Sequence, residues 1–336
     1  MVLLAGCKGL DLRVEPDTKT PKMMFHKTKG FDARLNHFDY PYPVKNFDLN
    51  VQQQKLEMAY MDISPATGIA NLGTVVLLHG KNFGGYYFDR IIKLLNEQGF
   101  RVIVPDQIGF GKSSKPYNLQ YSFQQLAQNT FKLLDSLKIQ EFTIVGHSMG
   151  GMLATRMSLM EPKKIKKLIM INPIGLEDYR LLTGYKSVNE LFESELQNSE
   201  EKIKNYQLTF YYNGVWKDEY APLNAPAIGW ISGPDFRLTA YTAALTSEMI
   251  YTQPVVHEFS HLQVPSVLII GDKDTTAIGK AWASEENKKV MGNFIELGKK
   301  YEKLAKNSQL ILLEGKGHVP FIEDFEQFKM AFLKSL

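Results

Sequence analysis

The segment FTIVGHSMGGMLATRMSLM, residues 142–160, joins a short apolar run to a longer segment with helical spacing. Its first four residues are rich in the aliphatic and β-branched side chains that fill buried parallel strands. From Met149 onward, apolar residues recur three and four positions apart, as on one face of a helix. Between the two lies Gly-His-Ser-Met-Gly, residues 146–150. A strand that turns this sharply into a helix predicts a strained backbone at Ser148, with its hydroxyl at the start of the helix.

The pattern G-x-S-x-G at residues 146–150 is a weak signal by itself, and the flanking segments make it stronger. About 0.1 matches are expected by chance in a chain of this length. The buried run before the motif and the helical pattern after it favour a functional turn over an ordinary glycine-rich one. A serine hydroxyl is a weak nucleophile at neutral pH, so a catalytic Ser148 requires a base elsewhere in the chain.

Short apolar runs and helical patterns alternate over most of the remaining chain. The candidate strands are residues 74–78, 101–104, 142–145, 168–171, 266–270 and 309–313, and the candidate helices are 88–98, 123–137, 149–160 and 325–336. This alternation predicts an α/β fold, with a mostly parallel sheet covered by helices on both faces. Upstream, residues 44–51 and 55–63 favour an antiparallel hairpin.

The alternation stops between residues 174 and 261, a stretch rich in aromatic residues. We interpret this stretch as a helical cap inserted into a core of residues 30–173 and 262–336, over the edge of the sheet where ligands bind in open α/β folds. Residues 1–29 form an N-terminal extension. The candidate substrate-binding residues are Phe83 of the core and Tyr211, Trp216 and Trp230 of the cap. The alternative is that the cap aromatics only pack against one another.

The order of residues along the chain selects a base for Ser148. In folds with this strand-to-helix turn, the partners follow in the order serine, acid, histidine. Six of the seven histidines precede the strand that is expected to deliver the acid, which leaves His318. It lies between glycine and valine in residues 315–320, directly after the last candidate strand.

The acid is expected just after the strand 266–270, in Gly-Asp-Lys-Asp-Thr-Thr, residues 271–276. The spacing favours Asp274, which would orient the imidazole and stabilise its charged form, with Asp272 as the alternative. Acyl transfer also requires backbone amides aimed at a developing oxyanion. We expect them from Met149 and from Lys81, with Asn82 as the near alternative.

Taken in order, these motifs resemble the α/β-hydrolase superfamily over residues 50–336. The quoted matches are His-Gly at 79–80, the segment PDQIGFGKS at 105–113, the serine turn, residues 271–274 and Gly-His at 317–318. The resemblance is to capped carboxylesterase-like and haloperoxidase-like hydrolases. It implies a serine hydrolase that cleaves a small ester, or less readily an amide, through an acyl-enzyme without a cofactor or metal. Asp106 is implied to brace a turn.

The resemblance separates some branches of the superfamily from others. Epoxide hydrolases and haloalkane dehalogenases use an aspartate nucleophile, so the serine at 148 disfavours them. Proline iminopeptidases have a similar layout but usually carry tryptophan at the position of Met149. An iminopeptidase-like activity therefore remains an alternative.

A second motif points to a different class of enzyme. His257, Glu258 and His261 match H-E-x-x-H, in which two imidazoles on one helical face bind zinc and the glutamate acts as base. Glu285 or Glu286 would supply a third ligand. Prolines at 254 and 265 leave room for barely three turns of helix, so a zinc peptidase is the less favoured alternative.

Composition narrows the possible partners and suggests a location. The chain has 39 basic and 36 acidic residues scattered along its length, which disfavours nucleic-acid binding. Its one cysteine, Cys7, excludes an intramolecular disulfide. Residues 2–7, VLLAGC, resemble the lipobox of bacterial lipoproteins, so we expect lipidation of Cys7 and a periplasmic protein anchored to the outer membrane, with a cytoplasmic location as the alternative.

Overall fold

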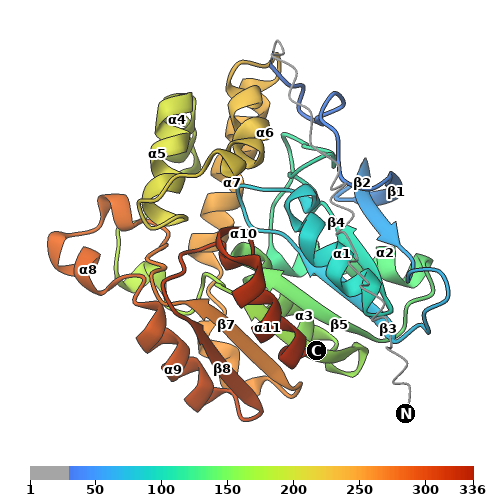
Figure 1. The fold of residues 1–336 in the computed structure, drawn as a ribbon. Coiled ribbons are helices and arrows are strands. Elements are labelled where there is room, and N and C mark those ends of the chain that lie inside the picture. Colours follow the sequence, from blue (N-terminus) through green and yellow to red (C-terminus); the bar gives the residue numbers. More distant parts are fainter. Residues whose placement is uncertain (1–29) are drawn as a thin grey trace, which may run out of the picture.

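A computed structural model describes residues 30–336, which are built around one eight-stranded sheet (Figure 1). The strand order is β1-β2-β4-β3-β5-β6-β7-β8. β1 and β2 form an antiparallel hairpin and β2 is antiparallel to β4, whereas every other neighbouring pair is parallel. The strands are β1 Val44–Val51, β2 Gln54–Ile63, β3 Gly73–Leu78, β4 Phe100–Pro105, β5 Phe142–His147, β6 Ile165–Ile171, β7 Ser266–Gly271 and β8 Ser308–Leu313.

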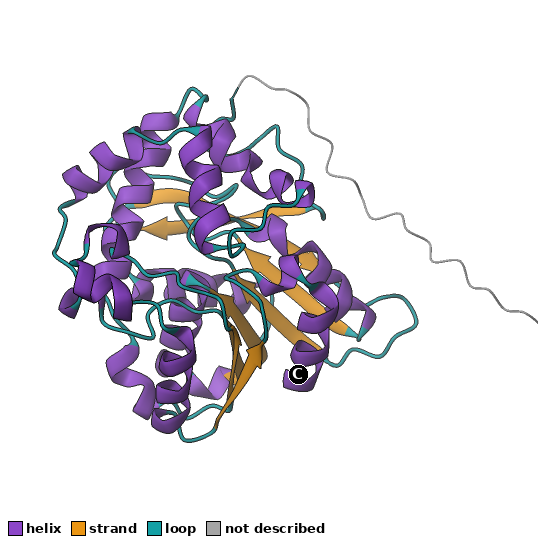
Figure 2. Ribbon diagram, turned by 60° about the vertical axis from the view of Figure 1, so that its left-hand side comes forward, coloured by secondary structure: helices purple, strands orange, loops and turns teal. Residues whose placement is uncertain are grey.

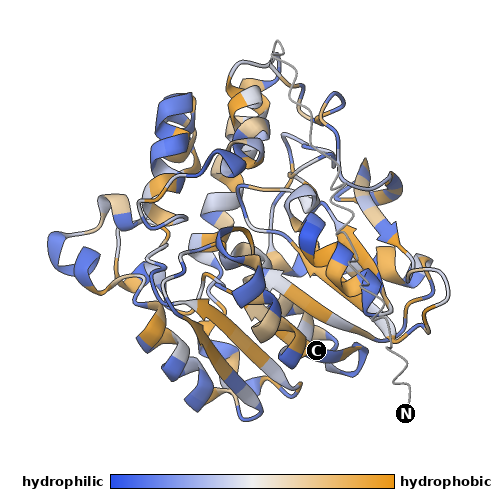
Figure 3. Cartoon of the chain, in the orientation of Figure 1, coloured by the Kyte–Doolittle hydropathy of each residue, from blue (hydrophilic) through white to orange (hydrophobic). Residues whose placement is uncertain are grey.

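The inner strands are apolar along their length because helices cover both faces of the sheet. All six residues of β7 are buried, and so are the last four residues of β3, β4, β5 and β6. Orange dominates β7 in the hydropathy colouring of Figure 3. Continuous burial explains why these strands appear in the sequence as uninterrupted aliphatic runs.

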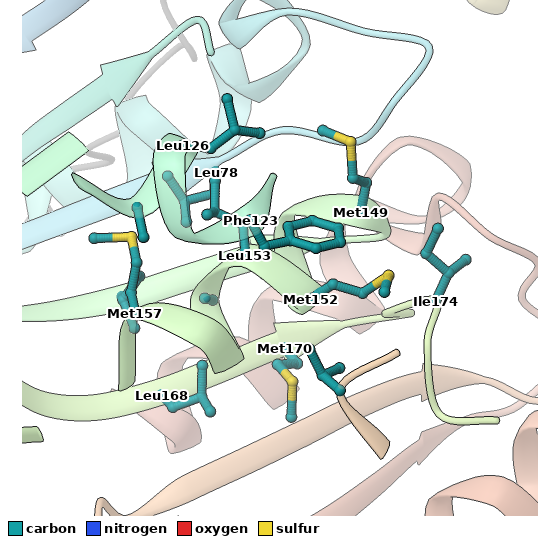
Figure 4. Close-up of a cluster of buried hydrophobic side chains, with 14 of the residues drawn as sticks. Leu78, Phe123, Leu126, Met149, Met152, Leu153, Met157, Leu168, Met170 and Ile174 are labelled. Atoms are coloured by element: carbon teal, nitrogen blue, oxygen red, sulfur yellow. The ribbon is translucent and has the colours of Figure 1, made fainter. Parts of the chain in front are cut away.

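Each face of the sheet has its own hydrophobic core, and Figure 2 shows helices on both sides of the strands. α1 (Asp89–Glu97) and α11 (Phe325–Ser335) contribute to one core. α2 (Phe123–Ser136), α3 (Met149–Met160) and α9 (Phe294–Leu304) contribute to the other. Figure 4 shows part of this second core, where Phe123 of α2 and Met152 of α3 lie near Leu78 of β3.

Four further helices lie between β6 and β7 in the sequence. They are α4 Val188–Leu196, α5 Glu200–Phe210, α6 Ala221–Ile231 and α7 Phe236–Thr252. Ser187 and Glu190 form a capping box at the start of α4, and the Ser199 hydroxyl accepts the Lys202 amide at the start of α5. In Figure 1 these helices gather above the sheet. The short helices α8 Glu285–Val290 and α10 Pro320–Glu323 follow β7 and β8.

The fold predicted from the sequence is confirmed. The predicted hairpin corresponds to β1 and β2, the six predicted strands to β3–β8, and the predicted insertion 174–261 contains α4–α7. Within residues 30–336, no helix combines the length and apolar character needed to cross a membrane. Cys7 and the rest of the predicted extension 1–29 lie outside the described residues.

Candidate active site

Ser148 occupies the turn between β5 and α3, and its backbone φ is positive, with φ +55° and ψ −121°. For a residue with a Cβ atom, such a conformation costs about 1–3 kcal/mol and persists only where the surrounding structure enforces it. Ser148 is the N-cap residue of α3, yet its side chain makes no capping hydrogen bond. The hydroxyl therefore remains available, at the wall of a cavity that Ser148 helps to line.

Two glycines allow neighbouring backbone to pack tightly around this turn. A Cβ atom at Gly150 would overlap the carbonyl oxygen of Leu78 at the end of β3. A Cβ atom at Gly80 would lie 3.1 Å from the Cβ of Ser148. The loop that follows β3, residues 79–84, thus lies directly against the serine.

Asp274 and His318 form a buried pair after β7 and β8. Oδ2 of Asp274 lies 2.7 Å from Nδ1 of His318, and the residues are 2% and 0% exposed. The amide of Thr276 donates to the other carboxylate oxygen at 2.8 Å. Nε2 of His318 is buried and has no hydrogen-bond partner within residues 30–336. This nitrogen is therefore free to take or give a proton.

Asp272 makes different contacts from Asp274. Its carboxylate accepts the Gly315 amide at 2.7 Å and lies beside the ammonium of Lys273. Of the two predicted acids, only Asp274 contacts the imidazole, so the geometry favours Asp274 in the orienting role.

Asn172, at the end of β6, connects the loops that carry the acid and the histidine. Its Nδ2 donates to Oδ2 of Asp274 at 2.8 Å and to the carbonyl of Gly317 at 3.2 Å, while its Oδ1 accepts the Gly271 amide at 3.1 Å. None of the sequence motifs predicts a role for Asn172. The one signal for it was a polar side chain directly after a buried strand, at the edge where ligands bind.

His147 links the loop after β3 to the loop that carries His318. The Gly80 amide donates to the Tyr87 hydroxyl at 2.8 Å, and this hydroxyl lies 2.8 Å from Nδ1 of His147. Nε2 of His147 lies 2.8 Å from the carbonyl oxygen of His318, which only accepts, so Nε2 carries the proton and Tyr87 donates to Nδ1. Burial holds the pKa of His147 well below its usual value and keeps the ring neutral. No sequence motif predicts this chain of contacts.

The carboxylate of Glu323, in α10, binds the backbone of Gly317, the residue before His318. Each of its carboxylate oxygens lies 3.0 Å from the amide nitrogen of Gly317, which donates to them. Burial raises the pKa of Glu323 to about 7. The His318 amide in turn donates to the carbonyl of Tyr211 at 3.1 Å, so the histidine loop is fixed from several sides.

The two predicted oxyanion donors lie next to Ser148. Met149 is the first residue of α3, so its amide has no acceptor within the helix. Among the described residues, no group accepts a hydrogen bond from the Lys81 amide, and Lys81 lines the same cavity as Ser148. The neighbouring Asn82 is anchored by its side chain, which donates to the Tyr211 hydroxyl at 2.8 Å.

A cavity of about 470 Å³ lies over Ser148, between the core loops and α4–α7. Tyr211 and Trp230 line it, and the Tyr211 ring stacks 4.8 Å from the His318 imidazole. Further apolar walls come from Ile174, Leu191, Tyr206, Phe210, Phe236 and Trp282. The cavity thus has a largely apolar interior with the serine at its wall.

Phe83 and Trp216 lie outside the lining of this cavity, unlike the sequence-based expectation. Phe83 stacks on Tyr87, with ring centroids 4.4 Å apart, because its loop turns the ring toward η1 (Gly85–Phe88). Trp216 packs edge-on against Tyr212 and Tyr220, in a cluster of aromatic side chains. Both therefore serve packing in this structure.

The residues of the possible zinc motif do not form a metal site. They lie in a short 3₁₀ helix, Val256–His261, where residues four apart do not share a face. Glu258 forms an ion pair with Arg156, and Nε2 of His257 lies 2.8 Å from Asp178. No group of three potential metal-ligating side chains gathers within the part of the chain that the structure describes.

Comparisons with known proteins agree with the fold. A family model for the alpha/beta hydrolase fold matches residues 73–325. The structure of a probable hydrolytic enzyme from Pseudomonas aeruginosa PAO1 superposes with a TM-score of 0.90 at 44% identity, covering 91% of this chain and 98% of that one. The chain belongs to the α/β-hydrolase fold family.

More distant relatives have different activities. Lipase 3 of Moraxella sp. (strain TA144) is 25% identical over 293 residues, which are 84% of this chain and 83% of the lipase. A haloalkane dehalogenase of Mycolicibacterium paratuberculosis is 29% identical over 150 residues, which are 44% of this chain and 48% of the dehalogenase. The family is thus clear, whereas its members differ in chemistry.

Proposed function

We propose that the protein is a serine esterase that cleaves small carboxylic esters through an acyl-enzyme. The observation that carries this proposal is the combination of a strained, uncapped Ser148 with a buried Asp274–His318 pair whose Nε2 is unpartnered. In this mechanism His318 takes the proton of Ser148 as Oγ attacks the ester carbonyl. Catalytic hydrogen bonds of this kind often tighten only when substrate is bound.

The remaining groups have defined tasks in this reaction. The amides of Met149 and Lys81 donate to the oxygen of the tetrahedral intermediate, where losing one donor costs about 10²–10³ in rate. His318 then returns the proton to the departing alcohol. In the second half of the reaction, His318 takes a proton from water as the water attacks the acyl-enzyme. His318 then returns a proton to Oγ of Ser148 as the carboxylic acid leaves.

The charge of the cavity favours esters over iminopeptidase substrates. A peptidase of that kind must hold the cationic amine of its substrate, which an acidic wall would do. Among the described residues that line the cavity there are four lysines and one acidic side chain, Glu195, and Glu195 already pairs with Lys81 at 3.6 Å. A free amine would meet repulsion there.

We further propose that α4–α7 act as the cap that determines which ester fits. Support comes from the shared cavity, because Ser148 and Lys81 of the core and Tyr206 and Trp230 of the insertion line the same space. The apolar walls favour an acyl chain of several carbons over acetate.

The test is a series of p-nitrophenyl esters of increasing acyl length, run beside aminoacyl arylamides. Ester turnover should exceed arylamide turnover, and Ser148→Ala and His318→Ala should each remove at least about 10³-fold of it in a folded protein. The double variant should be little worse, since the two groups act as a unit. Additive losses, or unchanged turnover by Ser148→Ala, would contradict the proposal.

A further inference from the structure

The proposed oxyanion donor Lys81 lies in a short turn, residues 80–83, which we call the oxyanion turn. The Phe83 amide donates to the Gly80 carbonyl at 3.2 Å and closes this turn, so that Lys81 and Asn82 are its two central residues. The Gly80 amide donates to the Tyr87 hydroxyl at 2.8 Å, which fixes the start of the turn to the core. The direction of the Lys81 amide then depends on what holds the two central residues.

Both central residues bind the helical insertion through their side chains. Nζ of Lys81 lies 3.6 Å from a carboxylate oxygen of Glu195, near the end of α4. Nδ2 of Asn82 donates to the hydroxyl of Tyr211, directly after α5, at 2.8 Å. The Glu195 side chain is 25% exposed, whereas Tyr211 is only 4% exposed. Since a partly exposed ion pair contributes little, the hydrogen bond to Tyr211 is the stronger constraint on the turn.

Tyr211 also contacts the loop that carries His318. Its carbonyl accepts the His318 amide at 3.1 Å, and its ring stacks on the imidazole with the ring centroids 4.8 Å apart. A Cβ atom at Gly317 would overlap the same carbonyl oxygen, so the residue before the histidine packs directly against Tyr211. One residue of the insertion therefore contacts both the oxyanion turn and the proposed base.

The surroundings of Tyr211 fix its position and its protonation state. Its amide donates to the Gln207 carbonyl of α5 at 2.8 Å, and the Tyr206 ring packs edge-on against its ring at 5.5 Å. Burial raises the pKa of Tyr211 well above its usual value, so the hydroxyl keeps its proton at neutral pH. A phenolate at this point would repel a developing oxyanion, whereas the neutral hydroxyl does not.

We propose that Tyr211 is a positioning residue, which places the Lys81 amide through Asn82 and the His318 imidazole through its own carbonyl and ring. This inference rests on the proposed esterase function and makes catalysis depend on the seating of α5 against the core loops. A donor stabilises the oxyanion only where it points at the position of that oxygen. Releasing the turn from Tyr211 therefore lowers the rate of the chemical step and leaves substrate affinity unchanged.

Tyr211→Phe tests the hydroxyl alone, because the ring keeps its place against His318. For p-nitrophenyl hexanoate, kcat should fall about tenfold, which is less than the loss of a whole oxyanion donor, and KM should stay within about twofold of the wild type. Tyr212→Phe is the matched control. The hydroxyl of Tyr212 is buried without a hydrogen-bond partner among the described residues, and Tyr212 does not line the cavity. Its kcat should equal that of the wild type.

Asn82→Ala removes the other partner of the hydrogen bond and keeps the backbone amide. It should lower kcat by about the same factor as Tyr211→Phe, and the double variant should be little worse than either single variant, because all three lose the same contact. Additive losses would overturn the inference.

A transition-state analogue separates positioning from general damage. An alkyl trifluoromethyl ketone adds to Ser148 and places a negative oxygen in the oxyanion site. Its inhibition constant should rise about tenfold in Tyr211→Phe, while the inhibition constant of the product hexanoate stays the same. Equal changes for the two inhibitors would mean that Tyr211 only supports the shape of the cavity, which contradicts the inference.

The outcomes distinguish failure of this inference from failure of the esterase function. Ser148-dependent hydrolysis by the wild type, with full kcat in Tyr211→Phe, would overturn the inference alone. If the wild type hydrolyses no ester, the esterase proposal fails. In that case hydrogen exchange of the Gly80 and Phe83 amides still decides whether Tyr211 holds the turn: Tyr211→Phe should accelerate it about tenfold relative to Tyr212→Phe, and equal exchange overturns the inference.

Discussion

Asn172 donates a 2.8 Å hydrogen bond to Oδ2 of Asp274, the same oxygen that lies 2.7 Å from Nδ1 of His318. Because Asn172 also bonds the carbonyl of Gly317 and accepts the Gly271 amide, one carboxamide fixes both loops that carry the pair. The orientation of the imidazole therefore depends on a residue that does not itself touch the substrate cavity.

Asn172→Gly should lower kcat about 10- to 100-fold with little change in KM, since the carboxamide orients catalytic groups and does not line the cavity. Glycine is the suitable replacement because Asn172 has φ +41°, a conformation in which other side chains are strained. Steady-state kinetics with a p-nitrophenyl ester provide the measurement. A kcat within twofold of the wild type would show that Asn172 does not position the pair.

Asp274→Asn should reduce ester turnover by at least about 10³-fold, because an amide at this position favours the wrong imidazole tautomer and cannot stabilise the charged ring. Asp272→Asn is its matched control, two residues away and bonded to Gly315. We expect the control to retain most of the activity. The reverse order of the two effects would move the role of the acid to Asp272.

Trp230→Ala should change the ratio of kcat/KM between p-nitrophenyl hexanoate and p-nitrophenyl acetate by at least about fivefold, since Trp230 lines the cavity. Trp216→Ala removes a ring that packs against Tyr212 and Tyr220 outside it. That variant should lower the melting temperature and leave the ratio within twofold. Equal effects on the ratio would assign both rings the same role.

Glu323→Gln should flatten the dependence of stability on pH. Burial raises the pKa of Glu323 from 4.5 to about 7, so the folded protein retains a proton that the unfolded chain has lost. The stability from this proton is full below about pH 4.5 and is lost as the pH rises toward 7. Urea midpoints from pH 5 to 8 should fall less for the variant than for the wild type.

The control for this comparison is Glu326→Gln, on the exposed side of α11. It should follow the wild-type profile. If the Glu323→Gln and wild-type profiles run parallel across this range, the buried carboxyl of Glu323 has no influence on stability.

The sequence revealed those parts of the site that depend on local pattern or chain order. The strand, serine and helix of residues 142–160 are contiguous, and His318 follows from the order of the remaining elements. The interactions of Asn172 with Asp274 and of His147 with His318 join residues 102 and 171 positions apart. Such pairings depend on how the strands assemble, and no spacing along the chain reveals them.

Two other misses have local physical causes. Phe83 is predicted from the sequence to bind substrate, but in the structure its ring stacks on Tyr87. The sequence pattern does not predict α9, because Gly298 interrupts the spacing of its apolar residues. In the structure that glycine lets the helix approach the sheet, where a Cβ atom would lie 2.9 Å from side chains of Ile270 and Leu310.

The central claim is that Ser148 is the nucleophile, and covalent labelling by a fluorophosphonate tests it most directly. Such a reagent phosphonylates a serine only where a base and an oxyanion site activate it. Mass spectrometry of the intact protein and its peptides should find one adduct, located on Ser148, with loss of ester turnover in proportion to labelling. Ser148→Ala should remain unlabelled and inactive. An adduct on another residue, or ester turnover that persists in Ser148→Ala, would contradict the claim.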